Sequence, residues 1–126
     1  MIRGIVTREL DAWVELAIAN DQQPTVSFSA VVDTGFNGCL TLPRVVLERF
    51  QARPLTRVVV TLADGSKTVS DLFELTILWD GRPLTIEVDA AETEPLIGMA
   101  LLAGHDLQMR VVPDGEVTIR AVPANL

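Results

Sequence analysis

Short runs of apolar and β-branched residues, separated by turn residues, dominate the pattern along this chain. Residues 25–32 alternate polar and apolar positions at first, as a half-buried strand does, and then become uniformly apolar. Comparable runs predict further strands over residues 13–18, 57–63, 67–79, 84–88, 107–112 and 116–119. The pattern predicts an all-β protein.

Asp-Gly pairs separate several of these runs and predict tight turns. Aspartate followed by glycine readily supplies the positive φ angles that hairpin turns require. The three pairs are Asp64-Gly65, Asp80-Gly81 and Asp114-Gly115. Strands joined in this way pair antiparallel with their neighbours, so we expect a meander of hairpins and no βαβ repeat.

Two short segments have a helical pattern. Residues 43–50 begin with Pro43, and proline is tolerated at the start of a helix because the N–H that it lacks has no partner there. Residues 99–102 form about one turn between Gly98 and Gly104. We therefore expect one or two short helices beside the strands.

The composition narrows the class of protein. A length of 126 residues fits one domain, and 48% hydrophobic residues suffice for a folded core. The formal net charge is −7, and the sequence has no basic run, which argues against nucleic-acid binding. No apolar stretch approaches the roughly 20 residues that span a membrane, and no signal-peptide pattern follows the N-terminus, so we expect a cytoplasmic protein.

Cysteine and histidine are too scarce for the usual metal and disulfide sites. Cys39 is the single cysteine and His105 the single histidine of the sequence. One thiol cannot form an internal disulfide, and this pair falls short of a Cys-His zinc site. We expect no metal and no cofactor, an inert buried thiol at Cys39 and a surface histidine in a loop.

The most informative segment is an apolar strand that ends in a carboxylate. Val31 and Val32 lead directly into Asp33-Thr34-Gly35. Gly35 has no side chain, so its N–H can approach a carboxylate or a ligand closely. The tripeptide alone is also explained by a strand that ends in a turn.

The order of the motifs along the chain resembles that of the retropepsin-like aspartic proteases. Asp33-Thr34-Gly35 is followed by an apolar segment at residues 40–43, and a later hairpin has the glycine-containing tip Asp64-Gly65-Ser66. Leu96-Ile97-Gly98 then resembles the hydrophobic-hydrophobic-Gly element of that family. The resemblance covers about residues 13–119 of one domain spanning 1–126, and it implies a small closed acid-protease β-barrel with a flap hairpin.

The resemblance also implies a mechanism. One domain supplies one aspartate and the reaction needs two, so two chains would form a homodimer in which Asp33 meets its symmetry mate. Thr34 would hydrogen-bond across the dimer, and Gly35 would direct N–H groups toward the carboxylates. Asp64, Gly65 and Ser66 would form a flap over a peptide or protein substrate. Leu96, Ile97 and Gly98 would pack beside the catalytic loop.

Two positions depart from the family pattern. Phe36 follows the Asp-Thr-Gly loop where the family commonly has Ser, Thr or Ala, and a phenyl ring cannot hydrogen-bond a carboxylate. Ala100 stands where an acidic or amide residue is common. Two alternatives therefore stay open: a protease-fold dimer with weak or no catalysis that binds peptides or assembles, and an unrelated small barrel in which Asp33 is a turn residue.

The remaining polar and aromatic residues have plainer interpretations. The two tryptophans are expected to pack in or near the core. The acidic segment Asp89, Glu92 and Glu94 is interpreted as a solvated loop. Asp71 and Glu74 are expected to be exposed on the flap hairpin. For Arg110, an outward orientation and a dimer contact are both compatible with the sequence.

Overall fold

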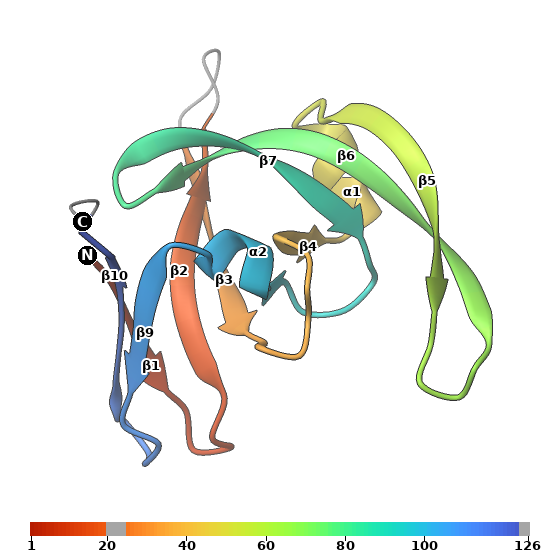
Figure 1. Ribbon diagram of the computed structural model, residues 1–126. Coiled ribbons are helices and arrows are strands. Elements are labelled where there is room, and N and C mark those ends of the chain that lie inside the picture. The colour runs from red at the N-terminus through yellow and green to blue at the C-terminus, as the bar shows by residue number, and fades with distance from the viewer. Residues whose placement is uncertain (20–24, 124–126) are drawn as a thin grey trace.

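The computed structural model describes residues 1–19 and 25–123, and within this part the chain forms ten strands and two short helices (Figure 1). The strands are β1 (Ile2–Val6), β2 (Ala12–Ile18), β3 (Val26–Val32), β4 (Leu40–Leu42), β5 (Arg53–Thr61), β6 (Lys67–Trp79), β7 (Arg82–Ala90), β8 (Leu96–Ile97), β9 (His105–Met109) and β10 (Glu116–Ala121). The helices are α1 (Arg44–Arg49) and α2 (Met99–Leu102).

Six of the strands close into a barrel. The hydrogen-bonded order of the sheet is β5-β6-β7-β4-β8-β3-β2-β1-β10-β9, and β6 also pairs with β2. That additional contact, Ala17 with Leu78 and Ile18 with Ile77, completes a ring of β2, β3, β8, β4, β7 and β6. The predicted fold class, an all-β closed barrel with two short helices, is confirmed.

The barrel interior follows from the two-residue period of its strands. In β2 every second side chain, from Ala12 to Ile18, is buried, and in β6 the same alternation runs from Phe73 to Trp79. Ile77 of β6 and Val88 of β7 are fully enclosed. Burial of such side chains removes apolar surface from water and supplies the main driving force for folding.

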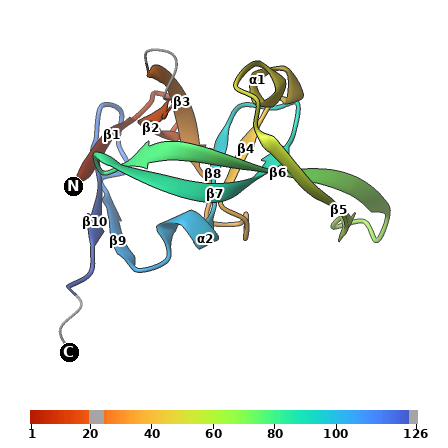
Figure 2. The same ribbon diagram turned by 90° about the horizontal axis from the view of Figure 1, so that it is seen from above.

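The remaining strands extend from the barrel in two directions. On one side β1, β10 and β9 continue the sheet from β2 (Figure 1). On the other side β5 pairs with the first half of β6, and this hairpin projects from the barrel as an arm (Figure 2). We call residues 53–74 the β5–β6 arm.

The predicted Asp-Gly turns lie at hairpin ends. Asp80 and Gly81 have φ angles of 53° and 79° and connect the paired residues Trp79 and Arg82, so β6 and β7 are joined by a two-residue turn. In the third pair Asp114, with φ of 65°, takes the left-handed conformation.

The N-terminal strand was missed by the sequence pattern. β1 pairs with β2 and β10, but its sequence Ile2 to Val6 contains Arg3 and Gly4 and shows little alternation. A Cβ at Gly4 would lie 2.2 Å from the carbonyl oxygen of Trp13, so glycine permits the close approach of the two strands. No helix of the described residues is long and apolar enough to cross a membrane.

Candidate active site

Asp33 directly follows β3, at the point where this strand pairs in parallel with β8. Val31 pairs with Leu96 and Val32 with Ile97. The N–H of Asp33 donates to the carbonyl oxygen of Ile97 at 2.9 Å. The apolar strand therefore positions the aspartate against the hydrophobic-hydrophobic-Gly element.

The loop after β3 folds back on the aspartate. The N–H of Gly35 donates to Asp33 Oδ1 at 2.9 Å, and the N–H of Phe36 donates to the Asp33 carbonyl oxygen at 3.1 Å. The Asp33 side chain is half-buried, whereas Thr34 and Gly35 are exposed in the single chain. One carboxylate is thus oriented by its own loop and accessible at the surface.

Gly98 lies in direct backbone contact with this loop. Its N–H donates to the carbonyl oxygen of Cys39 at 2.9 Å, and the N–H of Ala100 donates to that of Gly38 at 3.1 Å. A Cβ at Gly98 would lie 2.1 Å from the Gly38 carbonyl oxygen. Glycine is required here because any side chain would push the Asp33 loop away from α2.

The ring of Phe36 covers the same glycines. A Cβ at Gly38 would lie 2.5 Å from Phe36 Cζ, and one at Gly98 would lie 2.5 Å from Phe36 Cδ2. Phe36 is half-buried. The residue that departs from the family pattern therefore packs within the loop, and its bulk fills space that the two glycines leave open.

A buried hydroxyl supports the site and was not singled out from the sequence. Thr41 is 5% exposed, and its Oγ1 accepts the N–H of Leu96 at 2.9 Å. This bond ties β4 to β8 behind the loop. The available signal was a threonine between Leu40 and Leu42, since a polar residue in a buried run needs a hydrogen-bond partner.

A second carboxylate approaches the loop from β7, and its interpretation as part of a solvated loop was wrong. Asp89 belongs to β7 and is half-buried. Its Oδ2 would lie 3.0 Å from a Cβ at Gly38. Burial, and then repulsion from Glu87, raises the pKa of the Asp89 carboxyl. The sheet pairing of β7 with β4 draws Asp89 toward the loop, which its local sequence does not reveal.

Cys39 lies beside the same acidic residues. The thiol is half-buried, so the expectation of full burial was too strong. Burial and the charge of Glu87 raise the pKa of the Cys39 thiol. A raised thiol pKa favours the unreactive protonated form, in line with an inert cysteine.

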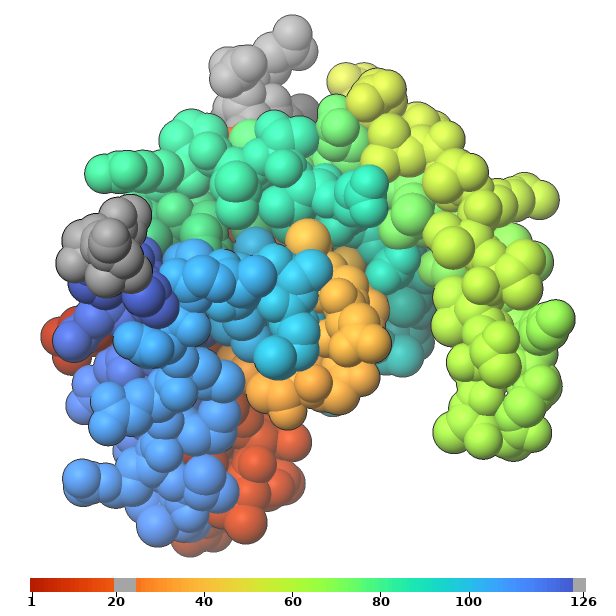
Figure 3. Space-filling view, viewed as in Figure 1, coloured from red at the N-terminus to blue at the C-terminus, as the bar shows by residue number. Residues whose placement is uncertain are grey.

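The tip of the β5–β6 arm is built by its own side chains. Asp64 Oδ1 accepts both the N–H and the hydroxyl of Ser66, at 2.8 and 2.6 Å, and Gly65 has φ of 86°. The hydrogen bonds from Ser66 lower the pKa of the Asp64 carboxyl. Figure 3 shows open space between the arm and the segment that follows β3, and the hydrogen bonds of Asp64, Gly65 and Ser66 stay within the arm.

The arm exposes several apolar side chains to solvent. The strongly exposed ones on this hairpin are Val58, Val59, Val60, Leu62 and Val69. Contiguous exposed apolar surface commonly marks a binding region.

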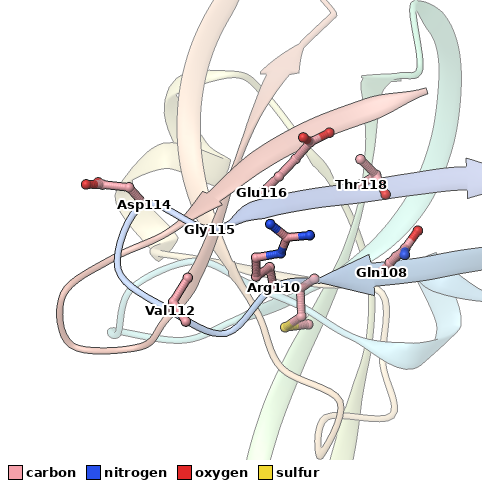
Figure 4. Close-up of a pocket in the computed structure, with 8 residues that line it drawn as sticks. Gln108, Arg110, Val112, Asp114, Gly115, Glu116 and Thr118 are labelled. Carbon is pink, nitrogen blue, oxygen red and sulfur yellow. The ribbon is translucent and has the colours of Figure 1, made fainter.

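Arg110 lies away from this region, at a hollow of about 670 Å³ on the β9–β10 hairpin (Figure 4). Arg110 is exposed there, with Glu116 on the adjacent strand in the same view. Arg3 also approaches Glu116, with 3.4 Å between Nη1 and Oε1. The outward orientation is thus correct for Arg110 in the single chain.

His105 is half-buried in β9, so its assignment to a surface loop was wrong. Its Nε2 accepts the indole N–H of Trp79 at 3.1 Å, and its Nδ1 lies 3.0 Å from the Ala103 carbonyl oxygen. The histidine therefore caps a buried tryptophan, and the two residues hold β6 against β9.

Metal chemistry finds no support in the described residues, which contain no group of three or more His, Cys, Asp or Glu side chains placed to hold an ion. What the geometry offers is one accessible carboxylate, oriented by a glycine-rich loop.

A closed six-stranded barrel, an Asp-Thr-Gly loop and an adjacent hydrophobic-hydrophobic-Gly segment together define the fold of the retropepsin-like aspartic proteases. No protein-family model and no curated protein sequence matches the chain. Among solved structures, the chain is similar to the crystal structure of a retropepsin-like aspartic protease from Rickettsia conorii. The TM-score is 0.59 at 17% sequence identity, and the alignment covers 96% of this chain and 90% of that one. The likeness shows the fold, as the sequence motifs predicted.

Proposed function

We propose that the protein is a homodimeric aspartic endopeptidase in which Asp33 of each copy contributes to one catalytic dyad. The observation that carries the proposal is the position of Asp33 in a retropepsin-like fold. The N–H of Asp33 donates to the Ile97 carbonyl oxygen, and the Asp33 carboxylate accepts the N–H of Gly35. Each chain of residues 1–126 would act as one domain with half of the site.

The proposed chemistry follows from the electrostatics of paired carboxylates. Two carboxylates about 3 Å apart cannot both ionise cheaply, so they share one proton. The ionised carboxylate takes a proton from a water molecule, which attacks the peptide carbonyl carbon. The protonated carboxylate donates to the carbonyl oxygen. The tetrahedral intermediate then collapses as the nitrogen accepts a proton and the C–N bond breaks.

Thr34 and the arm would complete the site on dimerisation and substrate binding. Thr34 is exposed in the single chain, which leaves its hydroxyl accessible to a second copy. The arm carries exposed valines on an edge strand, β5, and such an edge can bind an extended peptide through backbone hydrogen bonds. Closure of the tip, Asp64, Gly65 and Ser66, over the peptide would exclude water.

A binding or assembly function without catalysis is the second candidate. Phe36 and Ala100 favour it, because neither side chain can supply the polar contact that the family pattern has there. Against it, the Phe36 ring packs over Gly38 and Gly98, and the Gly35 N–H still orients the carboxylate.

The deciding experiment compares wild type with Asp33→Asn on a mixed peptide library between pH 3 and 8, with molar mass recorded in each buffer. The endopeptidase proposal expects a dimer whose cleavage is strongest below neutral pH and is lost in Asp33→Asn, which should still dimerise. A dimer without Asp33-dependent cleavage would favour the binding function. A monomer at high concentration would overturn both.

A further inference from the structure

A cavity of about 510 Å³ lies between helix α1 and the base of the β5–β6 arm. Its walls include Arg44 of α1, Ala52 and Leu55 before and within β5, and Phe73 of β6. Figure 2 shows α1 on one side of the β6–β7 ribbon and α2, whose N–H groups of Met99 and Ala100 donate to the loop that follows Asp33, on the other. The cavity is therefore separate from the surface that presents Asp33.

Two arginines converge on one carboxylate at this cavity. Arg44 pairs with Asp71 Oδ2, and Arg57 Nε lies 3.1 Å from Asp71 Oδ1. Each guanidinium has five N–H donors, and Asp71 engages one nitrogen of each. The triad therefore carries a formal charge of +1 and has spare donors at its edge, and the carboxylate of Glu48 elsewhere in the lining opposes this charge.

The rest of the lining is largely apolar. Phe73 is 6% exposed and lies beneath Arg44, whose guanidinium carbon is 5.5 Å from the ring centroid. Leu55, Leu72 and Ala52 are half-buried along the walls. Cavities with apolar walls and a few convergent polar groups are typical of small-molecule sites, and this volume is in their usual range.

The cavity also touches the point where the arm leaves the barrel. The register of β5 against β6 shifts between Pro54 and Thr56, and both residues line the cavity. A bulge bends its strand and increases the local twist, so it sets the direction in which the arm projects.

We propose that this cavity binds a small apolar carboxylate, whose carboxyl group takes the spare donors of Arg44 and Arg57 and whose apolar body contacts Phe73 and Leu55. Arginine is well suited to such a ligand because its planar fork matches a carboxylate and stacks on an aromatic ring. A bound ligand would hold the base of the arm and so bias its orientation. The site is independent of catalysis by Asp33.

The test is calorimetric titration of the full chain at pH 7 with hexanoate, 1-hexanol and acetate. Hexanoate should bind saturably with a Kd of about 1 mM or tighter, as its size allows, and at least tenfold more tightly than the alcohol or acetate. Equal binding of hexanoate and 1-hexanol, or no saturable binding of hexanoate up to about 10 mM, would overturn the proposal.

Variants at the rim test the role of charge. Arg57→Gln should weaken hexanoate binding about threefold, because water screens a side chain that is 80% exposed. Arg44→Gln should weaken it about tenfold. Glu48→Gln removes the opposing charge at the rim and should strengthen binding. If Glu48→Gln and Arg57→Gln both leave the Kd unchanged, charge does not select the ligand and the proposal fails.

Two further titrations complete the design. The Asp33→Asn variant lacks the proposed catalytic group and should bind hexanoate with the same Kd as wild type. The outcome for the cavity is therefore independent of the outcome for the endopeptidase proposal. The second titration uses N-acetyl-leucine and its amide, which mimic a peptide carboxyl terminus. Comparing the Kd of N-acetyl-leucine with that of hexanoate distinguishes a peptide carboxyl terminus from an aliphatic acid as the natural ligand. The proposal is supported if each acid binds with a lower Kd than its neutral counterpart, and the acid with the lower Kd identifies the natural source.

Discussion

Gly38 and Gly98 both lie against Phe36 but have different neighbours. Alanine substitution should therefore lower the free energy of unfolding by a different amount at each. At Gly98 the new Cβ would lie 2.1 Å from the Gly38 carbonyl oxygen and 2.8 Å from that of Phe36. Backbone must move to relieve these contacts. At Gly38 the new Cβ would meet the Phe36 ring at 2.5 and 2.8 Å, and a side chain can move or be removed.

The magnitudes follow from these contacts. Overpacking costs about 1–3 kcal/mol, and each hydrogen bond lost from the loop adds about 1 kcal/mol. Movement at Gly98 breaks the bonds from Met99 to Phe36 and from Ala100 to Gly38. Gly98→Ala should therefore lower the free energy of unfolding by about 3–5 kcal/mol, and Gly38→Ala by about 1–3 kcal/mol.

Urea unfolding at one fixed protein concentration measures both, in the wild-type and Phe36→Ala backgrounds. The double-mutant cycle should show that Phe36→Ala offsets at least about 1 kcal/mol of the cost of Gly38→Ala. Gly98→Ala should keep most of its cost in that background. Equal rescue of both glycine variants, or a Gly98→Ala cost below about 1 kcal/mol, would refute the packing described for this loop.

The other predictions concern a titrating group, a hydrogen bond and the core. Because the pKa of the Asp89 carboxyl is raised, the folded protein holds this proton more tightly than the unfolded chain does. The free energy of unfolding therefore falls as the pH rises from the pKa of this group in the unfolded chain to its pKa in the folded protein. Asp89→Asn should therefore raise the thermal midpoint at pH 7 and lose this advantage at pH 3, and an equal effect at both values would contradict the assignment. Thr41→Val leaves the Leu96 N–H without its partner and should cost about 1–3 kcal/mol in urea unfolding, whereas Thr41→Ser keeps the hydroxyl and should cost less. Leu47→Ala, at a side chain with no exposed area, should cost about 2–5 kcal/mol. Its matched control on the same helix, Val45→Ala at 68% exposure, should stay within about 0.5 kcal/mol, and similar costs for the pair would contradict the orientation of α1.

Much of the fold could be predicted from local sequence signals. The long strand β6 was predicted with its observed ends, because its alternation and the flanking Asp-Gly pairs are both strong signals. The helix at residues 99–102 was likewise predicted, from its flanking glycines. β5 begins at Arg53, earlier than expected, because pairing with β6 extends it through Pro54, which alone disfavours a strand.

The site was predictable only in part. Asp33, Ile97 and Gly98 could be assigned from motifs whose order along the chain resembles a known family, and the structure brings them together. The position of Asp89 depends on the pairing of β7 with β4, a contact between distant segments that no local pattern encodes. The packing of Phe36 depends on two glycines in different segments, so its ring orientation could not be inferred from one of them.

The parallel pairing of β3 with β8 has a consequence for the order of events during synthesis. About half of the chain separates Val31 from Leu96, so this contact is non-local and forms slowly compared with the hairpins. Until the segment through α2 has left the ribosome, the Asp33 loop has none of its backbone partners on Ile97, Gly98 and Ala100. A nascent chain is therefore expected to carry the aspartate without these partners, so that the proposed hydrolytic capacity appears only after the segment through α2 has been synthesised.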